Sequence, residues 1–310
     1  MREFGRIDKF FKPLSGTGSH NLQDDIANIM PYVVSTDTIC EGVHFIGDEA
    51  PETIAHKLLA VNLSDLASSG AKPYGYTLNV TTPKTIDDKW FESFAEGLKD
   101  TGKKYNLNLL GGDSVVGGDK IILSATMFGV APKNITLRKN AKSDDLVCLL
   151  GKIGGGVMGL KVAMGELEAP ELLKYYQTPQ PNIIEAITLN PYINASIDIS
   201  DGLIADLNHI CVASGVGIDL YLEDIPFVDE IGNHMDSYEN PYEMLLTGGD
   251  DYVVACTIPS DMIDGAVSSL NEIGKELYVI GKVNKTSKET RVFNKHNAEI
   301  NIKETGYEHK

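Results

Sequence analysis

Several apolar or β-branched runs of this chain end in an aspartate, usually beside Gly, Ser or Thr. Such runs end at residues 23–25, 35–38, 62–65, 110–113, 198–202 and 246–251. Carboxylates placed this densely beside buried strands repel one another unless they share cations. Hard oxygen ligands of this kind suit magnesium. The pattern therefore predicts a site that binds magnesium and phosphate.

The composition is that of a globular protein long enough for two domains. The chain has 310 residues, and domains commonly have about 150 residues. Lys and Arg number 27 against 44 Asp and Glu, a formal net charge of −17. This charge argues against nucleic acid or an anionic membrane as a partner. An anionic substrate would need metal ions or local basic residues.

No targeting or membrane segment is expected. The N-terminal residues 1–6 lack the apolar core of a signal peptide, and no stretch of about 18 apolar residues is present. These features predict a cytoplasmic protein. The cysteines are far apart and form no Cys-x-x-Cys pair, so neither a zinc site nor a disulfide framework is expected. They are Cys40, Cys148, Cys211 and Cys256.

Strand and helix patterns alternate in both halves of the chain, which predicts an α/β or α+β fold of two domains, the C-terminal one an α/β domain with a mixed sheet. We place the domains at residues 1–139 and 140–310, with a junction near 138–143. In the first domain we expect strands at 31–35, 74–81 and 119–130, and helices at 6–11, 51–69 and 87–104. In the second we expect strands at 144–150, 252–258 and 277–283, and helices at 157–164, 203–213 and 260–273.

Two aspartates of the first domain are candidate metal ligands. Ser35, Thr36 and Asp37 would present two hydroxyls and a carboxylate at a strand end, although an aspartate there can also simply cap a turn. Asp65 lies in the last turns of a largely apolar helix, beside Leu66. Burying that carboxylate unpaired is costly, so we expect an ion or a basic partner to meet it.

Two glycine-containing motifs add further carboxylates. Gly112 would let the backbone approach a phosphate while Asp113 holds a metal, although the same residues also fit a tight turn between strands. Asp198 and Ser200 face one way on an extended segment, and Asp201 begins a helix. The second motif therefore places two carboxylates beside a single cluster.

Other polar residues are weaker candidates. His44 can donate to a substrate oxygen, Asp250 and Asp251 can bind a cationic or hydroxyl-bearing group, and Arg138 with its neighbour can neutralise phosphate. All of them also fit a solvated surface. The chain has no P-loop, no dinucleotide-binding fingerprint and no Gly-x-Ser-x-Gly elbow.

Taken in order, the motifs resemble those of the thiamine-monophosphate kinase family from about residue 4 to residue 309. The resemblance is carried by residues 35–45, 60–67, 111–113, 197–203 and 248–252. It implies ATP-dependent phosphorylation of thiamine monophosphate to thiamine diphosphate. It also implies a homodimer whose N-terminal domains pair strands into a shared barrel, as in the superfamily that includes aminoimidazole ribonucleotide synthetase and selenophosphate synthetase.

The resemblance also implies a role for each matching residue. The magnesium ligands would be Asp25, Ser35, Thr36, Asp37, Asp65, Asp113, Asp198 and Asp201. The ATP contacts would be Gly112, Asp113, Arg138 and Ser200, and the substrate contacts would be His44, Asp250 and Tyr307. No catalytic base is expected, because the acceptor phosphate is already ionised near neutral pH and the reaction requires mainly positioning and charge screening.

The chain departs from the family pattern at a few points that concern nucleotide affinity and substrate placement. Asn21 and Gln23 replace the glycines of Gly-x-Gly-Asp-Asp, and Gly155 stands in the segment where Leu-Gly-Asp-Ser is common. Thr178 and Asn182 replace the arginines of Arg-Pro-x-Pro-Arg, and Asp250 replaces a glutamate. The alternatives are a superfamily member that acts on a purine precursor or on selenide, and a paralogue that binds nucleotide or a thiamine phosphate without turnover.

Overall fold

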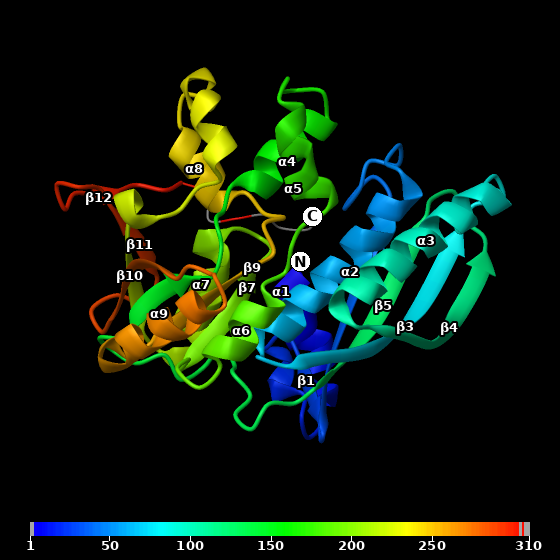
Figure 1. Ribbon diagram of the computed structural model, residues 1–310. Helices are drawn as coiled ribbons and strands as arrows, with labels where there is room; N and C mark the ends of the chain where they lie inside the picture. Colours follow the sequence, from blue (N-terminus) through cyan, green and yellow to red (C-terminus); the bar gives the residue numbers. More distant parts are fainter. Residues whose placement is uncertain (1–2, 304–305, 307–310) are drawn as a thin grey trace.

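The computed structural model describes residues 3–303 and residue 306, which fold around two β-sheets (Figure 1). The first sheet has the strand order β1-β2-β5-β3-β4. Its strands are β1 (Ala27–Ile29), β2 (Tyr32–Cys40), β3 (Lys72–Thr82), β4 (Asn108–Val116) and β5 (Ile122–Val130). All neighbouring pairs are antiparallel except β3 and β4, which are parallel.

The second sheet is mixed, as expected for the C-terminal half. Its order is β12-β11-β8-β10-β6-β9-β7, and β11 pairs in parallel with β8. Its strands are β6 (Leu146–Leu149), β7 (Ala195–Ile199), β8 (Gly217–Tyr221), β9 (Val253–Ile258), β10 (Tyr278–Asn284), β11 (Thr290–Phe293) and β12 (Glu299–Ile300). The chain thus has the expected mixed α/β architecture of two domains.

The helices lie beside and between these sheets (Figure 1). They are α1 (Glu3–Arg6), α2 (Pro51–Ser68), α3 (Asp88–Tyr105), α4 (Gly155–Ala163), α5 (Leu173–Gln177), α6 (Ile183–Leu189), α7 (Leu203–Ser214), α8 (Pro241–Thr247) and α9 (Ile263–Glu272). Within the described residues, no helix combines the length and apolar character needed to cross a membrane.

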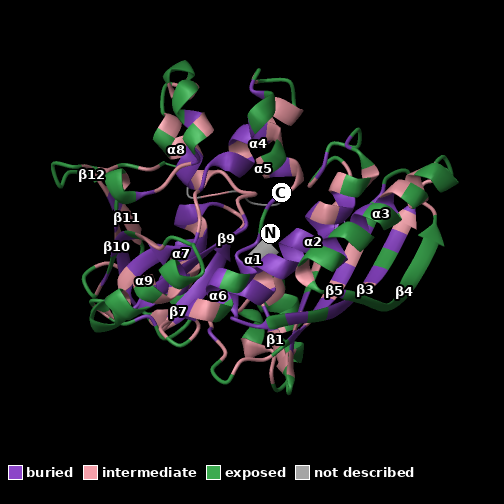
Figure 2. Ribbon diagram, in the orientation of Figure 1, coloured by how far each residue is buried: buried purple, intermediate pink, exposed green. Residues whose placement is uncertain are grey.

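Helix α2 is the centre of the molecule. It packs against β2 and β5 of the first sheet and against β7 and β9 of the second, and every residue from Lys57 to Ser64 is buried (Figure 2). Pro51 occupies its first turn, where a missing N–H costs nothing. Gly70 follows its end with φ of 72°, as the sequence predicts for a helix stop. Side chains on opposite faces of α2 therefore reach both halves of the chain.

The structure corrects two local expectations in the first sheet. The strand expected at 31–35 continues to Cys40, because residues 36–40 pair with β5, so Asp37 lies inside β2, opposite Ala125. The segment 111–113 is not a turn but part of β4. A Cβ on Gly112 would lie against the backbone carbonyl of Leu78, so the β3–β4 pairing itself requires this glycine.

The predicted helices of the first half are largely present. Asp87 caps α3 by accepting a 3.0 Å hydrogen bond from the Trp90 N–H, and Asn106 ends it in a left-handed conformation. The amphipathic segment expected at 6–11 instead divides into α1 and a π-helical turn over Ile7–Phe11. The short strands β1, β11 and β12 have too few residues for the alternation to be recognised.

The contact between α2 and α3 predicts that Gly97→Ala lowers the free energy of unfolding by about 1–3 kcal/mol. Helix propensity alone would favour alanine by about 1 kcal/mol. A Cβ at Gly97, however, would lie 2.5 Å from the Glu52 backbone and 2.9 Å from the Ala55 Cβ. Urea unfolding measures the difference.

Gly232→Ala is the matched control, because a Cβ there meets nothing within 4 Å. Equal stability of the Gly97→Ala variant and the wild type would show that α2 and α3 are not in close contact.

Candidate active site

Three carboxylates from distant parts of the sequence converge beside α2. Asp25 comes from the loop before β1, Asp65 from α2 and Asp198 from β7. One oxygen of each lies within 4.8 Å of the others. This is the one group of potential metal ligands found among the described residues. Its donors are oxygens only, which matches the preference of magnesium.

Burial and the neighbouring charges raise the pKa values of Asp65 and Asp198. Burial raises the pKa of Asp65 well above its ordinary value, and the charges of Asp37, Asp198 and Asp25 raise it further. Burial, followed by the charge of Asp25, raises the pKa of Asp198 to about 8. A shared cation would relieve both effects, because it favours the charged form of each carboxylate.

Strand β2 places two of the predicted ligands on the face that meets α2. The Ser35 hydroxyl donates to Asp65 Oδ2, and the Asp37 N–H donates to Asn62 Oδ1 at 3.1 Å. Thr36 lies on the opposite face, where its hydroxyl is within 3.1 Å of the Ala125 carbonyl and of the Thr126 hydroxyl. The strand alternation therefore separates the Thr36 side chain from the cluster.

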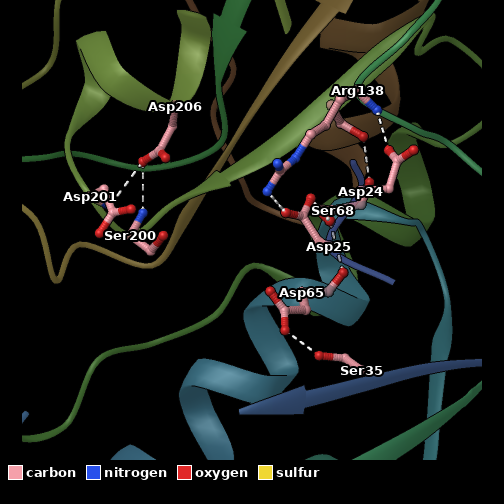
Figure 3. A network of polar contacts seen from close by, with 10 residues as sticks. Asp24, Asp25, Ser35, Asp65, Ser68, Arg138, Ser200, Asp201 and Asp206 are labelled. Atoms are coloured by element: carbon pink, nitrogen blue, oxygen red, sulfur yellow. Dashed lines mark hydrogen bonds and ion pairs between the residues drawn. The ribbon is translucent and has the colours of Figure 1, made fainter. Parts of the chain in front are cut away.

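Arg138 is the basic residue that meets the cluster. Its guanidinium forms an ion pair with Asp25, and its backbone N–H donates to Asp24 Oδ1 at 2.8 Å (Figure 3). The Ser68 hydroxyl donates to the other oxygen of Asp25 at 3.1 Å. Arg138 Nε is buried and has no hydrogen-bond acceptor in the described part of the chain. One arginine cannot balance several carboxylates, and its unpaired N–H is a donor that suits a phosphate oxygen.

The loop after β7 is held by a carboxylate that the sequence analysis did not single out. Asp206 Oδ2 accepts hydrogen bonds from the N–H groups of Ser200 at 2.9 Å and Asp201 at 3.0 Å (Figure 3). Gly202 has φ of 116° and precedes α7, so Asp201 lies just before the helix it was expected to begin. The available signal was an aspartate in the first turn of a predicted helix, where it can bind exposed N–H groups.

A second group of residues lies around Asp250. Its Oδ2 is 3.2 Å from Lys57 Nζ, and its Oδ1 accepts a 2.8 Å hydrogen bond from the Tyr252 hydroxyl. Lys57 Nζ also donates to the His44 carbonyl at 2.8 Å, and His44 Nδ1 accepts from the Cys40 N–H at 3.1 Å. The structure thus brings two predicted substrate contacts, His44 and Asp250, to one lysine that the sequence analysis missed.

Two further predicted site residues, Gly112 and Asp113, lie apart from these groups, as the Thr36 side chain does. Gly112 and Asp113 lie on β4, whose residues are all exposed (Figure 2). Asp113 accepts a hydrogen bond from the N–H of the adjacent Ser114. Tyr307 lies outside the described residues.

The departures from the family pattern have local structural partners. A Cβ on Gly155 would lie 2.6 Å from the Tyr175 ring. The ring therefore occupies the space that the side chain of a larger residue at position 155 would need. Asn182 donates to the Leu150 carbonyl at 3.2 Å and accepts from the Val254 N–H at 3.1 Å. Thr178 donates to the Lys174 carbonyl at 3.0 Å. At both positions where the family pattern has arginine, this chain thus has an uncharged side chain that forms hydrogen bonds within the protein.

A cavity of about 490 Å³ opens beside these residues. Thr178, Asn182 and Tyr175 contribute to its wall, together with Asp251. Asp251 accepts hydrogen bonds from the N–H groups of Gly154 at 2.8 Å and Gly156 at 2.9 Å at the start of α4, and burial raises its pKa to about 7. Asp250 and Asp251 therefore have different environments although they are adjacent.

Comparison with known proteins places this chain and its fold in a defined class. Family models for the N-terminal and C-terminal domains of AIR synthase related proteins match residues 23–131 and 142–294. The thiamine-monophosphate kinase of Caulobacter vibrioides is 36% identical over 270 residues, which are 83% of this chain and 76% of the relative. That of Escherichia coli K12 is 34% identical over 297 residues, 91% of this chain and 90% of the relative.

Solved structures agree with the sequence matches. The structure described as "AaThiL complexed with AMPPCP and TMP" has a TM-score of 0.87 and 28% identity, over 100% of this chain and 97% of that one. The thiamine monophosphate kinase of Aquifex aeolicus has a TM-score of 0.83, over 96% and 97%. The chain belongs to the thiamine-monophosphate kinase family of AIR synthase related proteins.

The carboxylate cluster predicts that magnesium raises the thermal unfolding midpoint more at pH 8 than at pH 5. An aspartate in the unfolded chain has an ordinary pKa of 3.8, and burial raises the pKa of Asp198 to about 8 in the fold without metal. Between these values the folded state holds a proton that the unfolded chain has released, so metal-free stability falls as the pH rises. Bound magnesium replaces the proton and removes this loss.

Thermal unfolding of metal-free and magnesium-saturated protein at both pH values measures the effect. Asp198→Asn should reduce the pH dependence of the magnesium effect, and Asp229→Asn, at an exposed ion pair with Lys152, should preserve it. A magnesium effect that is larger at pH 5 would contradict a metal site at these carboxylates.

Proposed function

We propose that this chain catalyses the ATP-dependent phosphorylation of thiamine monophosphate to thiamine diphosphate. The observation that carries the proposal is the convergence of Asp25, Asp65 and Asp198 within 4.8 Å beside Arg138. The relatives of 34–36% identity are named for this reaction, and the similar solved structure is described with AMPPCP and TMP. This agreement favours thiamine monophosphate over a purine precursor or selenide as the acceptor.

The chemistry requires charge screening more than proton transfer. The acceptor phosphate is ionised near neutral pH, so it can attack the γ-phosphoryl group of ATP without a base. Magnesium bound by Asp25, Asp65 and Asp198, with Asp37 and Asp201 nearby, would supply the positive charge that lets two polyanions approach. This number of carboxylates matches several magnesium ions rather than one.

The chain's own groups orient the reactants. Arg138 has a buried N–H that can donate to a phosphate oxygen, and its ion pair with Asp25 fixes the guanidinium. Asp206 holds the backbone of Ser200 and Asp201, which would contact ATP and metal. His44 and Asp250 would receive the organic part of thiamine monophosphate, whose cationic thiazolium is compatible with a carboxylate.

We also propose that two copies of the chain assemble through β4 and that Gly112 and Asp113 act from that interface. Every residue of β4 is exposed, including Leu109, Leu110 and Val115, which are 56%, 50% and 48% exposed. A long exposed edge strand with apolar side chains is a template for pairing. A shared barrel built from the two first sheets would cover it.

The proposed domain boundary is at 139/140, just before the second family match. A cytoplasmic location and a lack of nucleic-acid and membrane partners remain predictions from charge and composition. They agree with a small-molecule kinase.

Turnover should require magnesium, ATP and thiamine monophosphate together, and Asp65→Asn should lower kcat by about 100-fold or more. A metal site that stabilises transition-state charge contributes several kcal/mol, and about 2.7 kcal/mol corresponds to 100-fold. Coupled ADP release, with thiamine diphosphate identified by chromatography, measures this. Asp261→Asn, an exposed aspartate on the second half, is the control.

Thiamine diphosphate formation by Asp65→Asn at the wild-type rate would contradict the metal assignment. Tight binding of both substrates by the wild type with no product would instead support a binding paralogue.

The proposed interface predicts that Leu109→Asp with Val115→Asp converts a dimer into a monomer. Two carboxylates at a strand-pairing surface would be buried without partners. Their desolvation would then cost more free energy than the pairing of the strands contributes. Light scattering after size exclusion gives the mass. Val212→Asp, at a side chain on α7 that is 75% exposed, should leave the wild-type mass unchanged. A wild-type monomer would contradict this proposal but not the kinase reaction.

A further inference from the structure

Lys57 is a deeply buried charged side chain beside the site, with 2% of the side chain exposed. Its Nζ donates to the His44 carbonyl at 2.8 Å and to Asp250 Oδ2 at 3.2 Å. It also lies 3.6 Å from the centroid of the Tyr176 ring. An ammonium in this position is fully surrounded by an ion pair, a carbonyl and an aromatic face.

These contacts join the two halves of the chain. Lys57 belongs to α2, whereas Asp250 and Tyr176 belong to the second half. The Tyr176 hydroxyl donates to the same His44 carbonyl at 3.1 Å. Lys57 therefore fixes His44 and Asp250, the two proposed substrate contacts, relative to each other.

The backbone beside Asp250 is held in an uncommon conformation. Asp250 and Tyr252 have φ values of 69° and 53°, which non-glycine residues adopt at a cost. The Asp250 N–H donates to the Ser200 carbonyl at 2.9 Å, and the Tyr252 N–H donates to the Ile199 carbonyl at 2.7 Å. Such strain persists where surrounding contacts determine it, and it indicates that the direction of the Asp250 carboxylate matters.

Helix α2 sets the distance between the two ends of the site. Lys57 and Asp65 are eight residues apart on one helix, which corresponds to roughly 12 Å along its axis at 1.5 Å per residue. Ser64, between them, donates to the Tyr252 carbonyl at 3.3 Å. Helix α2 thus contacts residues 250–252 through Lys57 and Ser64. The same helix carries Asp65 of the carboxylate cluster.

We propose that Lys57 is a positioning residue for substrate specificity. It holds the Asp250 carboxylate at a fixed distance from the aspartate cluster, where it receives the cationic organic part of a phosphate ester whose phosphate lies at the cluster. This proposal rests on the proposed function. Beyond that function, it assigns to Lys57 a role that is exerted through Asp250 and that determines which phosphate ester the enzyme accepts.

Lys57→Met should raise the KM for thiamine monophosphate by about tenfold or more, because Asp250 loses its ion-pair partner and its side chain is then held, among the described residues, by the Tyr252 hydroxyl alone. The KM for ATP should stay within about twofold of wild type, since the contacts of Lys57 do not include the aspartate cluster. Steady-state kinetics with each substrate varied in turn measures both constants.

Lys104→Met is the matched control, because Lys104 of α3 contacts Gln180 and also joins the two halves. It should leave both KM values near those of wild type. An unchanged KM for thiamine monophosphate in Lys57→Met, or an equal rise in both KM values, would overturn the proposal. An equal rise is what a merely structural role predicts.

A double-mutant cycle with Asp250→Asn isolates the pair. Lys57→Met should weaken thiamine monophosphate binding by less than about twofold in the Asp250→Asn background, because the carboxylate that it positions is absent. Independent, multiplying effects would overturn the proposal. If Lys57→Met alone does not fold, this comparison of the two Asp250→Asn proteins by calorimetry decides the question. A wild type that makes no thiamine diphosphate would refute the proposed function, whereas an active wild type with no Lys57 effect would refute only this inference.

Discussion

The repulsion among Asp25, Asp65 and Asp198 is the constraint on which the site depends. Their oxygens lie within 4.8 Å of one another, and burial raises the pKa values of Asp65 and Asp198. Arg138 balances one charge through its ion pair with Asp25. The remaining negative charge is stable when cations share the carboxylates, and these cations are also what phosphoryl transfer between two polyanions requires. The same electrostatic problem therefore links stability and function.

Helix α2 brings this cluster together with the second group of polar residues. One side of the helix meets β2, through Asn62 and Asp65. Another side meets the second half, where Lys57 contacts Asp250 and the Ser68 carbonyl accepts a hydrogen bond from the Ser196 hydroxyl. The Ser68 hydroxyl contacts Asp25, in the loop before β1. A buried helix with polar groups on two sides is costly unless each group has a partner, and here the partners are the proposed binding groups. These polar contacts of α2 therefore lie at the boundary between the two halves of the chain.

The sequence predicted much of the fold and the main acidic residues, but not how they are held. Apolar spacing and the stop at Gly70 predicted α2, because local patterns determine a long amphipathic or buried helix. Asp37 was expected at a strand end, yet strand pairing with β5 places it inside β2. Asp206 had a local signal, its place in the first turn of a predicted helix, and its partners are the N–H groups five and six residues before it. Lys57 had no local signal, since its partner Asp250 lies 193 residues away. Such roles depend on tertiary contacts, which spacing along the chain does not determine.

The most direct test of this account is a crystal structure of the protein with manganese, a non-hydrolysable ATP analogue and thiamine monophosphate, using anomalous scattering to locate the metal. We predict manganese peaks at about 2.0–2.3 Å from carboxylate oxygens of Asp25, Asp65 and Asp198. The γ-phosphate and the substrate phosphate should both lie beside these ions. Fully bound substrates with no anomalous peak at the three aspartates, or with the two phosphates meeting elsewhere, would contradict the account.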